Sequence, residues 1–149
     1  MNDHLLRLMW VEIAGSHASW FEEYGHLYSA KMTDAVKQGQ GVGVEEHQHL
    51  MAEGAGLRRK MEEQMASEGI DAWICPSTTD SAPEGFDSTG SPIMNFPWTY
   101  GGFPVISLPV GMDDLGLPQG LQVVGVFNQD EVLTARAQLL FDALSPAQD

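Results

Sequence analysis

Apolar residues recur every three or four positions in the first 28 residues of the chain, which is the spacing of one helix face. The first set comprises Leu5, Leu6, Met9, Trp10 and Ile13. The second set comprises Trp20, Phe21, Tyr24, Leu27 and Tyr28. Gly15 and Ser16 lie between the two sets and mark a break. The pattern therefore predicts two consecutive helices.

A loop and a longer helix are predicted next. Residues 39–43 read GQGVG, a composition typical of a flexible loop. Residues 45–67 again show helical spacing. The apolar positions of this helix are Leu50, Leu57, Met61 and Met65. Gly54 and Gly56 each disfavour a helix by about 1 kcal/mol relative to alanine, so packing must compensate or the helix bends.

The pattern changes near Gly69, so that a helical segment, residues 1–69, is followed by a strand-containing segment, residues 70–149. Residues 71–75 (DAWIC) predict a short strand ended by the proline that follows. The chain then continues to about residue 97 with many Pro, Gly, Ser, Thr and Asp residues and almost no periodicity. A loop of this length is uncommon inside a compact domain and usually indicates either function or disorder.

Two strands and a final helix complete the predicted elements. Residues 104–109 (PVISLP) and 120–126 (GLQVVGV) are β-rich, and the linker between them is too short for a helical crossover. We therefore expect an antiparallel pair. Asn128 is positioned to cap the last helix, with Glu131 reaching back as in a capping box, and Pro146 stops it. Its expected buried face comprises Val132, Leu133, Leu140 and Leu144.

The composition excludes several classes of protein. The 149 residues are one ordinary domain in size, and 43% hydrophobic residues are enough to bury a core, so wholesale disorder is excluded. Lys and Arg total 7 against 21 for Asp and Glu, which gives a net charge of −14. This charge argues against binding to nucleic acid and to an anionic membrane surface, because both depend on Lys and Arg.

The cysteine content and the hydropathy argue against a disulfide-bonded, membrane-spanning or secreted protein. The single cysteine, Cys75, excludes an internal disulfide and is expected to behave as a small hydrophobe at the end of its strand. No stretch approaches the roughly 20 apolar residues that a membrane span needs. The first residues lack a basic region followed by an uninterrupted apolar one, so no signal peptide is predicted. We expect a soluble, acidic, cytoplasmic protein.

One segment contains residues that could ligate a metal. Glu45, Glu46, His47 and His49 lie within five residues of each other. On a helix, however, His47 and His49 lie about 200° apart and cannot bind one ion together. A further histidine, such as His17 or His26, would have to come from another segment. A polar helix face is the simpler interpretation, and no metal or cofactor is predicted.

Motifs for nucleophilic catalysis and for phosphate binding are absent. Ser77 follows a predicted strand but lies in CPSTTD, which lacks the glycines of a nucleophile elbow. The GQGVG segment fits neither a dinucleotide-binding nor a P-loop spacing. The pairs Glu62–Glu63 and Asp113–Asp114 are interpreted as solvated charges.

Three segments of the second half occur in an order that is itself a motif. They are DAWICPSTTDSAPEG, then NFPWTYGGFPVISLPVG, then GLPQGLQVVGVFNQDEVLTARAQLLFDAL. This order resembles the carboxyl-terminal part of an amidase signature enzyme and covers about half of the chain. The residues that carry the resemblance are Asp71, Pro76, Ser77, Thr99, Gly102, Pro104, Pro109, Gly111, Gly116, Leu117, Pro118, Gly120, Gln122 and Gly125.

The resemblance implies a fold, an activity and a missing part. Amidase signature enzymes hydrolyse amides with a serine nucleophile, a second serine in a cis peptide and a lysine. This chain has no two adjacent serines, and its lysines, Lys31, Lys37 and Lys60, precede no glycine-rich serine cluster. No catalytic residue is therefore assigned. The resemblance predicts an α/β fold in which this C-terminal portion of an amidase, truncated or partial, completes a mixed sheet and lines the substrate pocket.

The pocket-lining residues expected from the 76–100 loop are Asn95, Phe96, Trp98 and Thr99, because pockets combine aromatic walls with a few polar groups. Ordinary core packing is the alternative for the two aromatic residues. The expected partners are a small-molecule amide substrate and, as a protein partner, either a second copy of the chain or the missing N-terminal portion. Two other functions stay open: a non-catalytic ligand-binding or scaffold module, and a metal-dependent hydrolase that uses His17, His47 and His49.

Overall fold

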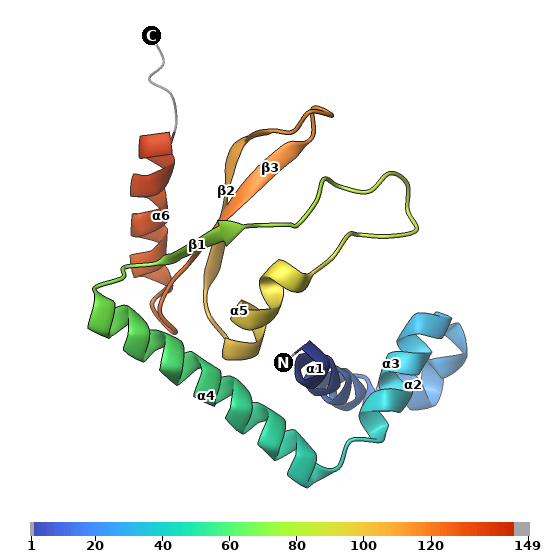
Figure 1. The fold of residues 1–149 in the computed structure, drawn as a ribbon. Helices are drawn as coiled ribbons and strands as arrows, with labels where there is room; N and C mark the ends of the chain where they lie inside the picture. Colours follow the sequence, from blue (N-terminus) through green and yellow to red (C-terminus); the bar gives the residue numbers. More distant parts are fainter. Residues whose placement is uncertain (1, 145–149) are drawn as a thin grey trace. The chain divides into compact units, whose positions relative to one another are not determined.

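The computed structural model describes residues 2–144 and divides the chain into two compact units, Met1–Ala55 and Gly56–Asp149. Figure 1 shows the elements in chain order. The long helix α4 (Val44–Glu68) contributes its first half to one unit and its second half to the other. Its bounds confirm the predicted helix, with Gly54 and Gly56 inside it.

The first unit is helical. It contains α1 (Asn2–Ser16), α2 (Ala18–Tyr24), the 3-10 turn η1 (Gly25–Leu27), α3 (Ala30–Gln40) and the start of α4. Its buried side chains include Leu5 and Ala14 of α1 and Val36 of α3, and these two helices pack together. The second predicted apolar face is only partly buried: Trp20, Tyr24 and Leu27 are exposed, whereas Phe21 and Tyr28 are half-buried and lie edge to face.

The predicted flexible loop at residues 39–43 is partly wrong. Helix α3, which the apolar pattern did not reveal, begins after Ser29, whose hydroxyl accepts a hydrogen bond from the backbone of Met32, and continues to Gln40. Gly39 is therefore helical and buried. A Cβ atom there would lie 1.9 Å from the carbonyl oxygen of Trp10 and 2.8 Å from Cβ of Ala14. This glycine is needed for close contact between α1 and α3, not for flexibility.

The second unit is built on a small sheet. Its elements after α4 are β1 (Trp73–Pro76), the 3-10 turn η2 (Ile93–Asn95), α5 (Phe96–Gly101), β2 (Val105–Met112), β3 (Pro118–Val124) and α6 (Asp130–Leu144). The strand order is β1-β3-β2, and both neighbouring pairs are antiparallel. This arrangement confirms the predicted β2–β3 pair and the predicted α/β class, and each of the three described strands is antiparallel to its neighbour.

One face of the sheet is apolar and packs against α6. Leu108 and Val123 of the sheet form the core cluster with Leu133 and Ala137 of the helix. Leu140 and Phe141 pack against this cluster. Because successive side chains of a strand point to opposite faces, burial of Val123 places Gln122 on the other face. Gln122 is 4% exposed, so the second face of β3 carries a buried polar side chain next to the fully buried Val124.

The start and the buried face of α6 differ from the prediction. The helix begins at Asp130, and Asn128 lies two residues earlier with a φ of 58°, so it forms part of a turn and does not cap the helix. Val132 and Leu144 are exposed, because the sheet contacts only the side of α6 that carries Leu133 and Ala137. Pro146 lies outside the described residues.

An arginine of α4 holds the end of α5 in place. Arg58 donates a hydrogen bond to the carbonyl oxygen of Gly101 (3.2 Å), and its guanidinium carbon lies 3.8 Å from the centre of the Phe127 ring. Gly102 adopts a left-handed φ of 73° at the end of α5, and a Cβ atom there would lie 3.4 Å from the Arg58 guanidinium. The glycine pair in the YGGFP segment therefore permits a left-handed helix end beside a cation.

The close approach at Gly39 gives a stability prediction. Replacement of Gly39 by alanine forces α1 and α3 apart, because the new methyl group overlaps the Trp10 carbonyl. We expect the free energy of unfolding to fall by about 1–3 kcal/mol, the usual effect of overpacking, as measured by chemical denaturation. The matched control is Gly15→Ala, since nothing lies within 4 Å of its Cβ position. An equal stability of the two variants would contradict the prediction.

Candidate functional site

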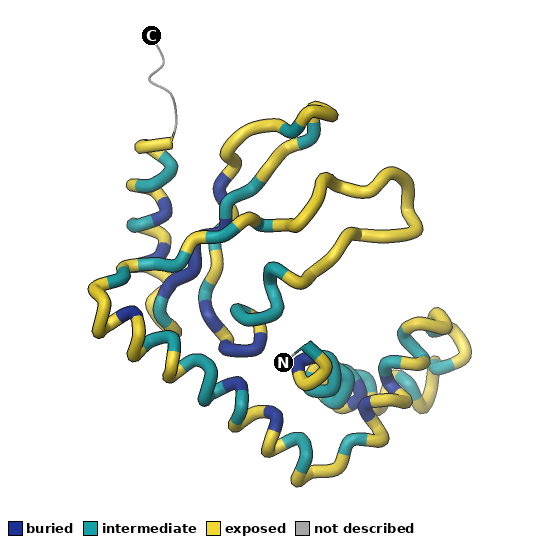
Figure 2. The backbone as a smooth tube through the Cα atoms, viewed as in Figure 1, coloured by how far each residue is buried: buried dark blue, intermediate teal, exposed yellow. Residues whose placement is uncertain are grey.

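A hollow of about 1000 Å³ lies between the loop that follows β1 and the turn that joins β2 to β3. The loop runs from Ser77 to Pro92, and nearly all of it is exposed (Figure 2). Hydroxyl and carboxylate side chains line much of the hollow. They are Thr78, Thr79, Asp80, Ser81, Thr89, Ser91 and Asp113. The structure confirms a long loop without regular secondary structure here, although η2 and α5 occupy the last part of the predicted stretch. A function for this loop stays a prediction.

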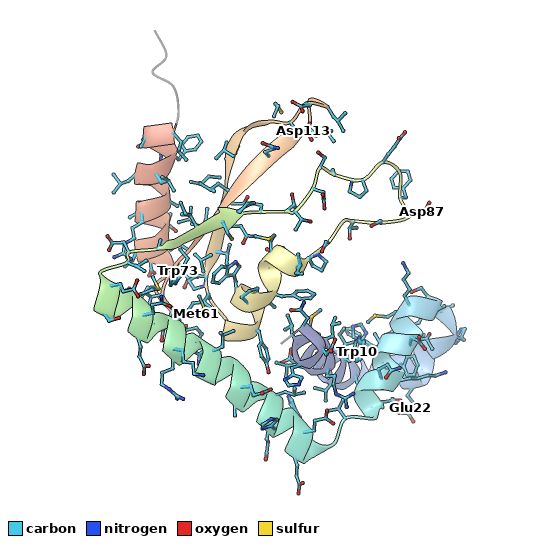
Figure 3. The ribbon with its side chains drawn as sticks, viewed as in Figure 1. Trp10, Glu22, Met61, Trp73, Asp87 and Asp113 are labelled. Atoms are coloured by element: carbon cyan, nitrogen blue, oxygen red, sulfur yellow. The ribbon has the colours of Figure 1, made fainter. Side chains whose placement is uncertain are left out.

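Asp113 fixes the turn beside this hollow (Figure 3). Its Oδ1 atom accepts hydrogen bonds from the backbone N–H groups of Leu115 (2.9 Å) and Leu117 (2.8 Å). Its Oδ2 atom accepts a hydrogen bond from the hydroxyl of Ser81 on the loop. These hydrogen bonds lower the pKa of the Asp113 carboxyl below its ordinary value, and the bond from Ser81 has the largest effect. Asp113 is therefore not simply a solvated charge, whereas its neighbour Asp114 is exposed.

Two serine hydroxyls meet above the central strand. Ser77 follows β1 and Ser107 lies on β2, on opposite sides of β3, and their Oγ atoms are 2.6 Å apart. The residue beneath them is Gly120 of β3, where a Cβ atom would lie 2.6 Å from both oxygens. The absence of a side chain at Gly120 is what allows the two hydroxyls to bond across the strand.

A chain of hydrogen bonds joins β1, β3 and η2. The Cys75 thiol donates to Oε1 of Gln122 (3.5 Å), and Nε2 of Gln122 donates to Oδ1 of Asn95. Because Gln122 is nearly inaccessible to solvent, these bonds satisfy polar atoms that would otherwise destabilise the sheet. Cys75 is half-buried, and in place of a purely apolar role it orients the Gln122 amide.

The four predicted pocket residues lie on η2 and α5. Asn95 accepts the hydrogen bond from Gln122, and Phe96 begins α5. Trp98 is half-buried and contacts Phe103 edge to face, with ring centres 6.2 Å apart, and Thr99 is exposed. The hollow beside the Ser77–Pro92 loop is lined by other residues, among them the adjacent Met94. A role for these four residues in the pocket therefore stays a prediction.

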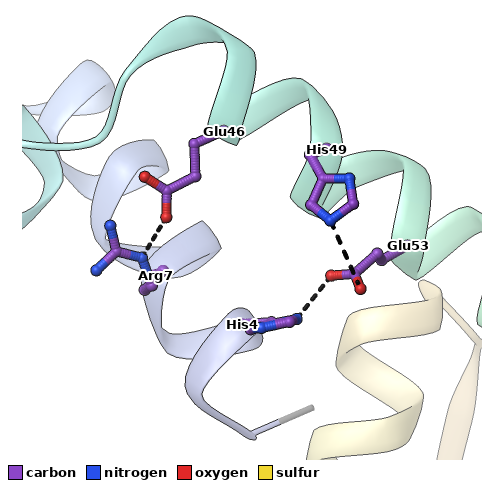
Figure 4. A network of polar contacts seen from close by, with 5 residues as sticks. All are labelled: His4, Arg7, Glu46, His49 and Glu53. Atoms are coloured by element: carbon purple, nitrogen blue, oxygen red, sulfur yellow. Dashed lines mark hydrogen bonds and ion pairs between the residues drawn. The ribbon is translucent and has the colours of Figure 1, made fainter.

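The histidine-containing segment of the first unit forms ion pairs (Figure 4). Glu53 lies 2.6 Å from His4 and 3.8 Å from His49. Arg7 donates to Glu46 at 2.5 Å, and this bond raises the pKa of Arg7 and lowers that of Glu46. Across residues 2–144, no three His, Cys, Asp or Glu side chains are grouped so that they could hold a metal ion. The geometry of these residues thus gives no support to a metal-dependent hydrolase.

Sequence reasoning missed three features of this site: the Ser77–Ser107 pair, Gly120 beneath it and the Asp113 bonds. Only the last had a local signal. An Asp that starts a short glycine-containing turn commonly bonds to backbone N–H groups two residues on, and residues 113–116 read DDLG. The serines are 30 residues apart in sequence, and no local pattern links them.

Part of the chain is similar in sequence to known proteins. The chain is 36% identical over 95 residues to a glutamyl-tRNA(Gln) amidotransferase subunit from Acaryochloris marina, and 32% identical over 93 residues to the corresponding protein of Synechococcus elongatus. These matches cover 58% and 57% of this chain but only 20% and 19% of the relatives, so the chain spans about a fifth of their length. No family model matches the chain.

Solved structures match almost the whole chain. A crystal structure of an amidase superposes with a TM-score of 0.80 and 26% identity, over 97% of this chain and 35% of the amidase. A bacterial aryl acylamidase of the amidase signature family superposes with a TM-score of 0.69 over 98% of this chain, and at 18% identity it shows the fold alone. The chain therefore carries part of the amidase signature fold, as its motifs predicted. Within residues 2–144, no helix combines the length and the apolar composition that a membrane span requires.

The bonds of Asp113 predict a dependence of stability on pH. A carboxyl whose pKa is lowered by folding stabilises the native state above its unfolded pKa, and this contribution is lost as the pH falls through the folded pKa. Asp113→Asn cannot accept the Ser81 hydrogen bond at Nδ2, so we expect it to be less stable than the wild type at neutral pH. The difference should shrink as the pH falls below about 4.

Denaturation midpoints of the wild type and Asp113→Asn, measured from neutral pH to below about pH 4, test the prediction. Asp114→Asn is the control, since the same change of charge falls on an exposed neighbour that makes none of these bonds. A constant difference between Asp113→Asn and the wild type at every pH would show that the carboxylate is not responsible.

Proposed function

We propose that residues 1–149 form a wall of the substrate pocket in an amidase that hydrolyses carboxamide C–N bonds. The observation that carries this proposal is the superposition on an amidase over 97% of the chain at 26% identity. Since only 35% of that amidase is matched, the proposal assigns to this chain one part of the enzyme. The hydroxyl-lined hollow beside the Ser77–Pro92 loop is where we expect substrate to be met.

The proposal places the nucleophile outside these residues. A serine hydroxyl is a weak nucleophile until an adjacent base takes its proton. Ser77 and Ser107 hydrogen-bond to each other, and neither hydroxyl bonds to a histidine, lysine or carboxylate within residues 2–144. In addition, the sequence holds no adjacent serines. We therefore expect the chain by itself to be inactive and the remaining residues of the enzyme to supply the catalytic groups.

A small neutral amide is the proposed substrate class. The amidotransferase relatives are named for a tRNA, but a net charge of −14 opposes direct contact with nucleic acid. Asn95, Phe96, Trp98 and Thr99 are proposed as further pocket lining, because Met94 next to them lines the larger hollow. The protein partner proposed is the remainder of the enzyme, with self-association as the competing arrangement.

A segment exchange tests the proposed function. The matching segment of the amidase with a TM-score of 0.80 is replaced by residues 1–149, and ammonia release from benzamide is measured. We expect the chimera to hydrolyse benzamide at a rate within about 100-fold of the parent enzyme, the loss expected from a small misplacement of groups. The amidase with that segment deleted is the control and should be inactive.

Two results would count against the proposal. The first is a chimera that is folded, as judged by circular dichroism, but releases no ammonia. If the purified 149-residue chain also melts cooperatively, the two results together favour the scaffold alternative. The second is benzamide hydrolysis by the purified chain alone that disappears in Ser77→Ala or Ser107→Ala, because the nucleophile would then lie within this chain.

A further inference from the structure

The Ser77–Ser107 pair borders a second, smaller hollow of about 350 Å³. Besides the two serines, its polar lining consists of Thr78 and Gln119. None of the described residues that line this hollow carries a charge. The lining offers no countercharge to an ion, and its hydroxyl and amide groups can both donate and accept hydrogen bonds, which suits a neutral polar ligand.

The geometry of the hydroxyl pair selects among neutral groups. One hydroxyl donates to the other across 2.6 Å, so the pair keeps one O–H donor and free oxygen lone pairs for a ligand. A carboxamide presents one acceptor oxygen and one N–H donor about 2.2 Å apart, as its bond lengths require. Its carbonyl can accept from the free O–H while its N–H donates to the other oxygen. A carboxylate offers two acceptors and no donor, so it can satisfy only half of this arrangement.

The hydrogen bond between the two serines requires a glycine at position 120 of the central strand. The two serines come from strands on opposite sides of β3, and only a residue without Cβ lets their oxygens approach, since a Cβ atom would lie 2.6 Å from each. The backbone N–H of Ser77 donates to the carbonyl oxygen of Gly120 (2.9 Å), which fixes Ser77 in line with the sheet. The pair is therefore held by backbone pairing before any ligand arrives, and such pre-organisation favours binding.

We propose that the Ser77–Ser107 pair above Gly120 is a binding subsite for the carboxamide group of the substrate. This inference rests on the proposed function and deepens it by naming the recognised group and the residues that recognise it. The subsite orients the amide by binding both its carbonyl oxygen and its N–H group, and residues outside this chain supply the bond-breaking groups beside it.

Titration of the purified, ¹⁵N-labelled chain tests the subsite without any need for catalysis. The probes are benzamide, benzoate, which lacks the N–H donor and is charged, and N,N-dimethylbenzamide, which keeps the carbonyl but has no N–H. We expect benzamide to shift the backbone amide signals of Ser77, Ser107 and Gly120 and to bind about tenfold more tightly than either analogue, as the loss of one hydrogen bond to a polar partner implies.

Three variants separate the pair from general effects. Ser107→Ala removes one hydroxyl, and Gly120→Ala keeps both hydroxyls but separates them, so both should weaken benzamide binding by about tenfold. Ser67→Ala removes an exposed hydroxyl of α4 that donates to a carbonyl of its own helix, and it should bind benzamide like the wild type. Because Ser107 is exposed, its variant should fold even if Gly120→Ala does not.

Several outcomes would overturn the subsite: benzoate binding as tightly as benzamide, no signal shifts at the three residues, or an unchanged affinity in Ser107→Ala. These outcomes are distinct from failure of the proposed function. If the chimeric amidase is inactive while the chain binds benzamide selectively, the subsite stands and the amidase role fails. If the chimera is active and Ser107→Ala leaves its KM unchanged, the subsite fails and the amidase role stands.

Discussion

The packing of α6 against one face of the β2–β3 pair is the contact on which the second unit depends. Leu133 is 2% exposed and belongs to the same cluster as Val123. The helix approaches the chain after β3 so closely that a Cβ atom on Gly125 would lie 3.0 Å from Cβ of Leu133. A strand alternates its side chains, so the burial of Val123 under α6 fixes which residues of β3 face the other way. The placement of Gln122 and Gly120 on the second face follows from this packing.

Two residues of the second face, Gln122 and Gly120, determine which polar groups meet there. Gln122 is buried and holds both Cys75 and Asn95, so it ties β1 and the start of α5 to the central strand. Gly120, two residues earlier on the same face, leaves room for the Ser77 and Ser107 hydroxyls to meet. A rigid sheet that positions small polar groups suits the wall of a pocket, since sites built on strands hold their geometry better than sites built on loops.

Local patterns predicted the elements well where one face of an element is buried and poorly where contacts are distant. The period of Leu50, Leu57, Met61 and Met65 identified α4 despite two internal glycines, and the short linker identified the β2–β3 pair. The prediction of a loop at GQGVG was partly wrong. A glycine that lets two helices approach closely, as Gly39 does, cannot be distinguished by composition from a glycine in a flexible loop. Val132 and Leu144 fit an apolar stripe, but the described sheet reaches only one side of α6.

The sequence by itself determined the order of the motifs, the acidic charge and most of the helices and strands, because these depend on residues close together in the chain. The likeness to part of an amidase was also contained in that order. Only the tertiary structure decided which polar groups converge: Ser77 with Ser107 are 30 residues apart, and Ser81 with Asp113 are 32 apart. Such pairs form when strand pairing brings remote segments together, and no periodicity of a single segment records that event.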